Sequence, residues 1–347
     1  MSLLPTIDYK VRILCMTYNH ARYIEETMNG FCMQETTFPF ICIIMDDCST
    51  DGEQEVINNY LSDKFIPFID GKIKSEETND YILSFVRHKT NHNCFFAVYF
   101  LKYNHYSRQK PKWRYYSNWN NLLYAKYIAL CEGDDHWIHP RKLQMQVDFM
   151  EEHPDYVLCH TDFNLSTGGY RNHSYIQTDN DNVFYETLTK GISIGTLTVL
   201  YRVDIYKHIP QLWIGKGWPM TDYPMWIEMS HEGKFKRLPD ITATYRILTE
   251  SFSHGDFDKE VRFRETVRDI RLFYSQHYGI SLPNNGLSAE YYLSLMKTAF
   301  KHHRKDAAKN FLAEARENNM VSRKLLIFYY ATIITPLGWM LRKKLNR

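Results

Sequence analysis

The sequence predicts an α/β protein with a mostly parallel sheet, because short apolar runs alternate with amphipathic segments along its first half. Residues 11–16 and 38–45 are apolar runs of strand length. The segments after them, 23–33 and from 53 onward, carry apolar residues at helical spacing. Such alternation is typical of a parallel sheet with helices packed on it. Later segments continue the pattern, with strands expected at 127–131, 157–160, 195–201 and 241–247 and helices at 140–150 and 223–230.

Two parts of the chain depart from this alternation. Between residue 65 and about residue 118, a strand is expected at 82–87, followed by a stretch rich in Tyr, Lys and Asn. We expect this region to be a long loop or insertion that is partly helical. After about residue 255 the sequence predicts amphipathic helices at 258–275, 288–302 and 304–318. The expected organisation is therefore an α/β domain at 1–255 and a helical extension at 256–347.

Composition excludes several classes of protein. The 347 residues are 44% hydrophobic and 24% charged with a net charge of +2, which argues against disorder and against a nucleic-acid partner. The seven cysteines contain no CxxC pair and predict reduced thiols. The first residues lack the basic and apolar regions of a secretory signal, so a cytoplasmic location is expected.

The tail carries a separate signal. Residues 325–341 form a 17-residue apolar stretch interrupted by Pro336 and flanked by Arg323-Lys324 and by basic residues at 342–344. A membrane span needs about 20 residues. The pattern favours a helix in the interface of an anionic membrane, on the inner face of the cell membrane. The alternative is a final helix that docks on the protein core.

Acidic clusters supply the chemistry. Asp46-Asp47 and the stretch Glu132–Asp135 directly follow predicted strands, and the carboxyl ends of parallel strands form the ligand-binding edge of such sheets. Adjacent carboxylates favour a divalent cation, and a diphosphate is its natural co-ligand. Each cluster alone also fits turn or cap chemistry. A third acid, Asp222, precedes a predicted helix and fits an N-cap equally well.

These clusters, taken in order, resemble the inverting family 2 glycosyltransferases. The resemblance spans roughly residues 10–254. It is carried by Thr17-Tyr18-Asn19, by Asp46-Asp47-Cys48-Ser49-Thr50-Asp51-Gly52, by Glu132-Gly133-Asp134-Asp135 with Trp137, and by Thr221-Asp222-Tyr223 with Trp226. It implies the GT-A fold and transfer of a sugar, a hexose or N-acetylhexosamine, from a nucleotide-diphosphate donor. A UDP-sugar is the expected donor, and a glycan or a lipid-linked molecule is the expected acceptor, as in polysaccharide biosynthesis.

The resemblance also implies residue roles. The loop of Thr17, Tyr18 and Asn19 would hold the nucleobase together with Asp47, with Tyr18 as a stacking face. Asp46 and Asp51 would shape the same loop.

On the other side of the site, Asp134 would approach the ribose or diphosphate. Asp135, with Asp134, would bind Mn²⁺ or Mg²⁺. Asp222 would be the general base that deprotonates the acceptor hydroxyl.

The sequence departs from the family pattern in three places. Glu132 stands where the family often has Asp. Near residue 245 the pattern reads Tyr-Arg-Ile-Leu, without the usual His, and His254 is a candidate substitute. The segment 118–127 replaces the usual one before the acidic stretch. Arg246 fits a phosphate contact, a brace for a carboxylate or an ordinary surface position, and Trp137 fits either the acceptor cleft or the core.

Two other functions compete. A phosphoryl-transfer protein could use an acidic Mg²⁺ pocket, but the second acidic stretch and the chain length fit it poorly. A non-catalytic protein that binds a sugar nucleotide without turnover is the other alternative.

Overall fold

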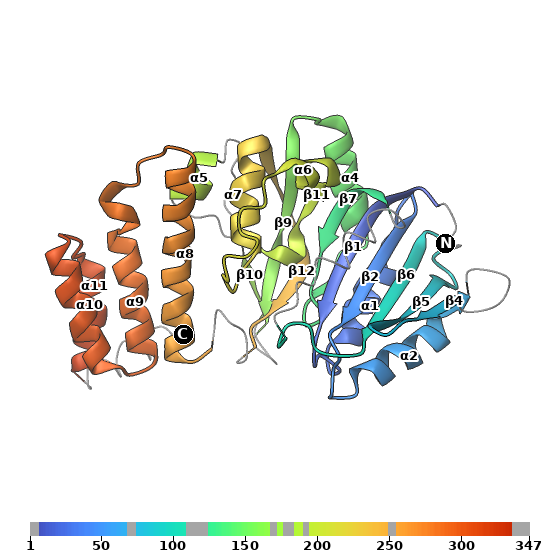
Figure 1. Ribbon diagram of the computed structural model, residues 1–347, viewed down its shortest axis with the longest axis horizontal. Helices are drawn as coiled ribbons and strands as arrows, with labels where there is room; N and C mark the ends of the chain where they lie inside the picture. The colour runs from blue at the N-terminus through green and yellow to red at the C-terminus, as the bar shows by residue number, and fades with distance from the viewer. Residues whose placement is uncertain are drawn as a thin grey trace. The chain divides into compact units, whose positions relative to one another are not determined.

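The computed structural model describes residues 7–67, 74–108, 124–166, 172–175, 184–189, 194–248 and 255–334. The chain divides into two compact units. The first comprises residues 1–183, 192–210 and 228–246 and holds the sheet (Figure 1). The second comprises residues 184–191, 211–227 and 247–347 and is helical in its described part.

A 12-stranded sheet forms the first unit, and its centre is parallel. Strand β1 (Tyr9–Thr17) lies between β2 (Phe40–Asp46) and β7 (Ala125–Leu130), and β6 (Cys94–Leu101) pairs with β2. The strand order is β3-β5-β6-β2-β1-β7-β11-β9-β12-β8, with β4 beside β5 and β10 beside β9. The remaining strands are β3 (Phe65–Pro67), β4 (Lys74–Glu77), β5 (Tyr81–His88), β8 (His136–Trp137), β9 (Tyr156–Ser166), β10 (Asn172–Tyr175), β11 (Leu200–Arg202) and β12 (Lys234–Arg246). The predicted fold class is confirmed.

Helices α1 (Ile24–Cys32), α2 (Glu53–Lys64) and α4 (Lys142–Glu152) contribute to one core against the sheet. This core joins Met28, Phe31, Ile57, Leu143 and Val147 of the helices to Val11, Ile13, Ile44 and Phe96 of the strands. The alternate residues of β2, among them Ile43 and Met45, pack in a second cluster. Because β2 is buried along its whole length, its sequence is a continuous apolar run.

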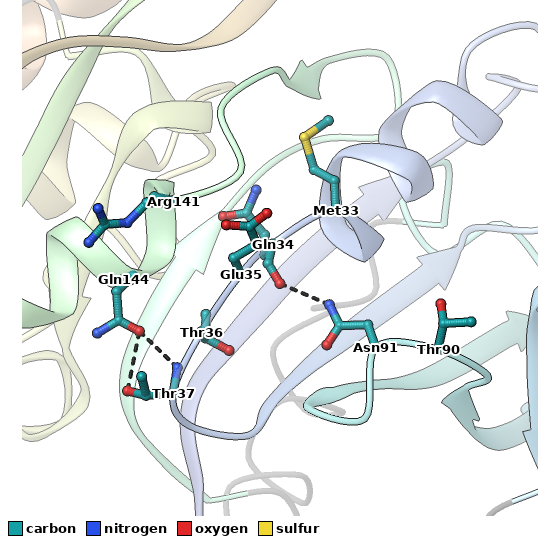
Figure 2. Close-up of a pocket in the computed structure, with 9 residues that line it drawn as sticks. All are labelled: Met33, Gln34, Glu35, Thr36, Thr37, Thr90, Asn91, Arg141 and Gln144. Atoms are coloured by element: carbon teal, nitrogen blue, oxygen red, sulfur yellow. Dashed lines mark hydrogen bonds between the residues drawn. The ribbon is translucent and has the colours of Figure 1, made fainter.

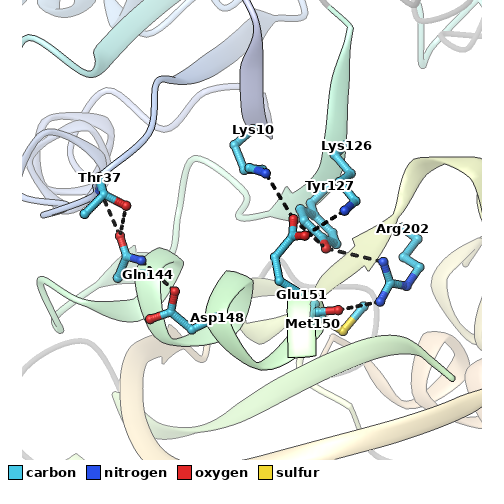
Figure 3. Close-up of polar contacts among 9 residues, drawn as sticks. All are labelled: Lys10, Thr37, Lys126, Tyr127, Gln144, Asp148, Met150, Glu151 and Arg202. Atoms are coloured by element: carbon cyan, nitrogen blue, oxygen red, sulfur yellow. Dashed lines mark hydrogen bonds and ion pairs between the residues drawn. The ribbon is translucent and has the colours of Figure 1, made fainter. Parts of the chain in front are cut away.

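The end of α4 is fixed to the sheet by polar contacts (Figure 3). Glu151 accepts hydrogen bonds from Lys10 Nζ at 3.1 Å, Lys126 Nζ at 2.8 Å and Tyr127 Oη at 3.1 Å. Arg202 donates to the carbonyl of Met150. These contacts tie α4 to β1, β7 and β11. The helix that follows the acidic stretch is therefore anchored at its far end.

The region after residue 65 corrects one expectation. It is not a partly helical insertion in its described part, but the strands β3, β4, β5 and β6. Strand β6, with the sequence CFFAVYFL, is buried along its whole length and lies parallel to β2. A strand covered on both faces lacks the polar alternation that marks a strand, so only its length and composition reveal it. Residues 109–123, which hold most of the Tyr/Lys/Asn-rich stretch, lie outside the described residues.

Two short helices complete the described part of the first unit, namely η1 (Thr196–Thr198) and α6 (Val203–His208). The expected strand at 195–201 is therefore mostly η1, followed by β11. Helix α7 (Asp222–Glu232) begins among residues of the second unit and ends among residues of the first. All seven cysteines are free.

In the second unit, α8 (Phe257–His277), α9 (Ala289–Lys301), α10 (Lys305–Glu317) and α11 (Arg323–Ile333) stand side by side, with α5 (Phe184–Thr189) beside α8 (Figure 1). The 3₁₀ turn η2 (Pro283–Gly286) precedes α9. Three of these helices begin at a side-chain cap, because Asp256, Ser288 and Ser322 accept from backbone N–H groups of the first turn. The three helices predicted after residue 255 are confirmed.

The last helices bear on the tail. Within the described residues, every helix is too short or too polar to cross a membrane. Leu325 of α11 is buried against Leu295 and Met296 of α9. The start of the apolar stretch therefore docks on the helical core, whereas residues 335–347 lie outside the described residues.

Candidate active site

Three loops meet at the carboxyl ends of the parallel strands. Thr17 at the end of β1 is paired with Asp46 at the end of β2, and Leu14 of β1 is paired with Leu130 of β7. Beyond β7 the chain stays against β1, since Gly133 N donates to Met16 O at 2.9 Å. The loops 17–21, 46–53 and 132–135 therefore lie along the edge at which open α/β sheets bind ligands.

Asn19 joins the first two loops. Its backbone lies in the left-handed region with φ of 58°, which Asn tolerates better than most residues. Its N–H donates to Ser49 Oγ at 2.9 Å, and its Oδ1 accepts from Thr50 N at 2.8 Å. Tyr18 beside it is 42% exposed, so its ring can meet a stacking partner.

Thr17 is buried, and it holds Glu53. The Oγ1 of Thr17 donates to Glu53, which also accepts from Ser49 Oγ at 2.8 Å and from His20 N at 2.8 Å. One buried carboxylate thus binds both loops, and burial raises the pKa of Glu53. Sequence reasoning does not single out Glu53, because an acid in the first turn of a helix is ordinarily explained by the helix dipole.

Asp46 and Asp51 organise the second loop from within. Asp46 is fully buried and accepts from Ser49 N at 3.2 Å and from Gln54 Nε2. Burial raises the pKa of Asp46, although these hydrogen bonds oppose the rise. Asp51 accepts from Glu53 N at 3.1 Å and, through its other oxygen, from Ala21 N at 2.9 Å. Both aspartates accept hydrogen bonds from backbone N–H groups of the loops.

Asp47 binds the chain that follows β6. Its side chain is fully buried, and its two oxygens accept from His105 N at 2.8 Å and Tyr106 N at 3.1 Å. Asn104 adds a hydrogen bond to the Asp47 carbonyl at 3.1 Å. The carboxylate therefore already holds two backbone N–H groups, and its expected contact with a nucleobase stays a prediction.

The acidic stretch is the third loop. Thr27 Oγ1 donates to the carbonyl of Gly133 at 3.0 Å. Asp135 is 2% exposed, and its Oδ1 accepts from Arg246 N, at the end of β12, at 2.8 Å. Burial, followed by the charges of Asp134 and Glu132, raises the pKa of Asp135. Asp134 itself is only half-buried, so it is the more accessible of the two expected metal ligands.

Arg246 braces this loop, which is one of the roles that its sequence left open. Its guanidinium is bonded to Glu26 and to the carbonyl of Asp134, and it lies over the Tyr23 ring at 4.9 Å. His136 Nε2 lies 3.3 Å from the same Glu26. Burial and then the charge of Arg246 lower the pKa of His136 to about 4. The loop is therefore held by one cation and a neutral imidazole.

The remaining candidate site residues from the sequence lie in different parts of the structure. Trp137 is fully buried and donates to the carbonyl of Leu197 at 2.8 Å, so it belongs to the core. Asp222 is the first residue of α7 and lies in the second unit, and its catalytic role stays a prediction. His254 and residues 118–123 lie outside the described residues.

The acidic stretch fits a divalent cation whose oxygen ligands would come partly from the protein and partly from a diphosphate. Within the described residues, no three His, Cys, Asp or Glu side chains are grouped to hold a metal by themselves. Mg²⁺ is commonly held by one or two carboxylates with phosphate and water oxygens. The charges of Asp134 and Glu132 already raise the pKa of Asp135, and a cation would relieve this repulsion.

A hollow of about 510 Å³ lies elsewhere on this unit (Figure 2). Thr37 and Asn91, which line it, precede β2 and β6, so the hollow is at the amino ends of the parallel strands. Gln144 Oε1 accepts from Thr37 N at 2.8 Å, and Asn91 Nδ2 donates to Gln34 O at 2.8 Å. These side chains bind the protein itself, so the hollow is not a second candidate active site.

The sheet and its loops define a GT-A glycosyltransferase fold. A mannosyltransferase from Pyrobaculum calidifontis, solved with GDP-mannose and Mn²⁺, matches 99% of this chain and 81% of its own, with a TM-score of 0.50 and 11% identity. Residues 13–80 match the model of glycosyl transferase family 2. The resemblance to family 2 glycosyltransferases seen in the sequence is confirmed by these matches.

Two curated relatives extend the match. An uncharacterized protein of Mycobacterium tuberculosis, Rv1520, is 26% identical over 263 residues, which are 73% of this chain and 63% of the relative. TuaG of Bacillus subtilis, named for a proposed role as a teichuronic acid biosynthesis glycosyltransferase, is 22% identical over 266 residues, which are 76% of this chain and 89% of TuaG. The chain thus spans 63% of the length of the mycobacterial relative.

Proposed function

We propose that this protein transfers a sugar from a nucleotide-diphosphate donor, with a UDP-sugar as the expected donor, to a hydroxyl group of a glycan or lipid-linked acceptor. The proposal rests on one observation: the loops after β1 and β2 are joined around buried Glu53, and the acidic loop after β7 lies against β1. The loops are thus already organised without a ligand, and preorganised polar groups are what a charged transition state needs.

The loops divide the binding of the donor. Tyr18 stacks on the base, and Asn19 and Asp51 hold the loop that carries Tyr18. Thr17 and Asp46 are buried and act as positioning residues through Glu53 and Ser49.

A Mn²⁺ or Mg²⁺ ion would be held by Asp134, and Asp135 would support the loop from behind. When bound, the ion neutralises the charge that develops on the leaving diphosphate. Arg246 keeps the loop in place through its contacts with Glu26 and the Asp134 carbonyl.

The reaction is a single displacement with inversion. Asp222 accepts the proton of the acceptor hydroxyl as its oxygen attacks the anomeric carbon, and the nucleoside diphosphate leaves from the opposite face of the sugar. One base on the acceptor side suffices, because no covalent intermediate forms.

Two measurements test this function. Thermal-shift screening of UDP-, GDP- and dTDP-sugars with Mn²⁺ identifies the nucleotide, because a ligand that binds only the folded state raises the melting temperature. Asp222→Asn should then lower turnover about 10²–10⁴-fold, as the loss of a general base does, while the thermal shift persists. Asp204→Asn, at an exposed aspartate of α6, is the matched control.

The outcomes separate the alternatives. Unchanged turnover in Asp222→Asn rejects this residue as the base. A thermal shift without any transfer by the wild type favours the non-catalytic nucleotide-binding protein. Incorporation of phosphate from a small phosphodonor, without sugar transfer, favours the phosphoryl-transfer protein.

We also propose a peripheral contact of the second unit with an anionic membrane. One face of α11 carries three exposed apolar residues at helical spacing, the last just after the end of the helix. These are Ile327, Tyr330 and Ile334, which are 46%, 47% and 48% exposed. Arg323 opens the same face, and the 13 residues after the described part carry Arg342, Lys343, Lys344 and Arg347 beside apolar residues. An apolar face bordered by basic residues is suited to an anionic lipid surface.

Sedimentation with vesicles tests this contact. The protein should sediment with phosphatidylglycerol vesicles and not with phosphatidylcholine vesicles. Ile327→Asp should abolish sedimentation, whereas Ile214→Asp, at a comparable isoleucine that is 45% exposed, should not. Equal sedimentation of both variants would exclude the α11 face as the contact.

A further inference from the structure

We propose that a groove between α8 and α9 binds a glycan that carries carboxylate or phosphate groups. The groove has a volume of about 400 Å³ and lies entirely within the second unit. Its polar lining includes Arg264, Arg268, Arg271, Ser288, Tyr291 and Ser294. No sequence motif of the family covers these residues, since the resemblance ends near residue 254.

The three arginines share one face of α8. Their spacing of four and then three residues places them one above the other along the helix. All three are partly exposed, with 26% of the Arg264 side chain and 32% of the Arg268 side chain accessible. The lining residues include one opposing carboxylate, that of Glu290. The lining itself therefore carries more positive than negative charge, and the carboxylates of Glu265 and Asp269 lie near Arg268 outside it.

The ion pairs of these arginines are weak, or their carboxylate partner is already paired with other cations. Arg268 lies 3.1 Å from Asp269, its neighbour in the chain, in a pair whose aspartate is 54% exposed. Exposed pairs of this kind contribute about 0–1 kcal/mol, so an incoming anion can replace Asp269.

Arg264 lies 3.9 Å from Glu260, which is buried and already paired with Lys301 and His302. Arg271 donates through Nε to the carbonyl of Leu188 at 2.8 Å, which fixes the side chain without neutralising it. A guanidinium has five N–H donors arranged to bind carboxylate or phosphate in pairs. Each of these arginines uses only part of that capacity in its bonds within the described residues.

The rest of the groove suits a sugar. The Arg268 guanidinium lies 5.6 Å from the centre of the Tyr291 ring, which also faces the groove. Ser288 and Ser294 also line the groove; their hydroxyl groups are bonded to the Tyr291 N–H and carbonyl, and each keeps capacity for a further hydrogen bond. Aromatic faces and hydroxyls bind the apolar and polar sides of sugar rings, whereas a free phosphate ion would use only the arginines. A glycan that bears anionic groups therefore uses the whole lining.

The role of the groove as an acceptor site rests on the proposed function, because only a glycosyltransferase would need an acceptor there. A second unit that holds an anionic glycan would supply the growing chain as acceptor. The binding itself does not depend on catalysis, so it can be measured without donor or turnover.

Isothermal titration of the full chain tests the groove. The probes are an oligogalacturonate, a phosphorylated oligomannoside, a neutral maltooligosaccharide of equal length, and inorganic phosphate. We expect one of the two anionic glycans to bind more tightly than both the neutral glycan and phosphate, with an affinity that falls as salt rises. Arg268→Gln should weaken that binding about tenfold.

Arg262→Gln is the matched control, because Arg262 is an exposed arginine of α8 outside the groove lining. Equal weakening in both variants, or binding no tighter than that of the neutral glycan, would overturn the proposal. Binding of inorganic phosphate alone would also overturn it. The UDP thermal shift is followed in parallel: its absence would count against the proposed function and leave a positive result for the groove intact.

Discussion

Gly133→Ala is the substitution whose effect follows most directly from the geometry of the candidate site. A Cβ at residue 133 would lie 2.1 Å from Thr17 Oγ1, 2.6 Å from Thr17 Cβ and 3.2 Å from His20 Nδ1. Optimal contacts between carbon atoms are about 3.5–4.0 Å. The added methyl group must therefore move, or move Thr17, by about 1 Å or more.

Neither side can move freely. Thr17 is β-branched and stiff about χ1, and its hydroxyl is bonded to buried Glu53. Gly133 is held by Met16, which accepts from its N–H at 2.9 Å, and by Thr27, which donates to its carbonyl at 3.0 Å. Overpacking of a fixed core costs about 1–3 kcal/mol, and we expect the upper end here.

Differential scanning fluorimetry with and without UDP and Mn²⁺ measures the effect. For a unit of this size, about 3 kcal/mol corresponds to a fall of about 6–12 °C in melting temperature. The nucleotide-dependent shift should also disappear, because the acidic loop is displaced from β1. Gly215→Ala is the control: nothing lies within 4 Å of its added Cβ, so it bears only the cost of its φ of 81°. A Gly133→Ala variant that melts within about 1 °C of the wild type and keeps its UDP shift would refute the reasoning.

Three further predictions concern charge. Arg246→Lys keeps the charge but loses the guanidinium fork that reaches both Glu26 and the Asp134 carbonyl. Turnover should fall about tenfold, because about 1–2 kcal/mol of interaction energy in the brace is lost. Unchanged turnover would contradict the bracing role of Arg246. Asp47→Asn turns an NH₂ group toward a backbone N–H, at about 1–3 kcal/mol, and should speed hydrogen exchange at His105 N, its 2.8 Å partner. Burial lowers the pKa of His160 from 6.5 to about 3, so the unfolded chain takes up the proton first and stability falls by about 1.4 kcal/mol per pH unit below 6.5. His160→Gln should flatten the stability curve between pH 6 and 4 and leave its slope at pH 8 unchanged, and an unaltered acid slope in urea titrations would reject this.

The strands that the sequence reveals only in part are those with buried polar residues. The runs at 157–160 and 241–247 are parts of β9, which extends to Ser166, and β12, which begins at Lys234. Arg237 of β12 binds Asp162 of β9 through two hydrogen bonds of 2.8 and 2.7 Å. Such a pair looks like loop chemistry in sequence, because the partner that permits its burial lies 75 residues away. Irregular register between these strands, including a shift between Leu238 and Ile241, weakens the pattern further.

The residues of the candidate site also fall into those that the sequence could assign and those that it could not. Residues whose partners lie in the same or the adjacent loop, such as Asp46 and Asp51, could be assigned to loop shaping from the family resemblance. Arg246 and Glu26 could not be paired, since 220 residues separate them and the sheet must form before they meet. Long-range pairs of this kind carry no periodic signal, so only the folded arrangement identifies them.

Internal pairing decides which charges of the acidic loops remain for a ligand. Asp46 and Glu53 are spent on N–H and O–H groups of the loops themselves, and Asp135 on the Arg246 N–H. Burial raises the pKa of all three, and the hydrogen bonds from those donors oppose the rise. Turning Asp135 toward a cation would give up its hydrogen bond from Arg246 N at the end of β12. Half-buried Asp134 has no such cost, which is why we assign it, rather than its neighbour, the contact with the metal.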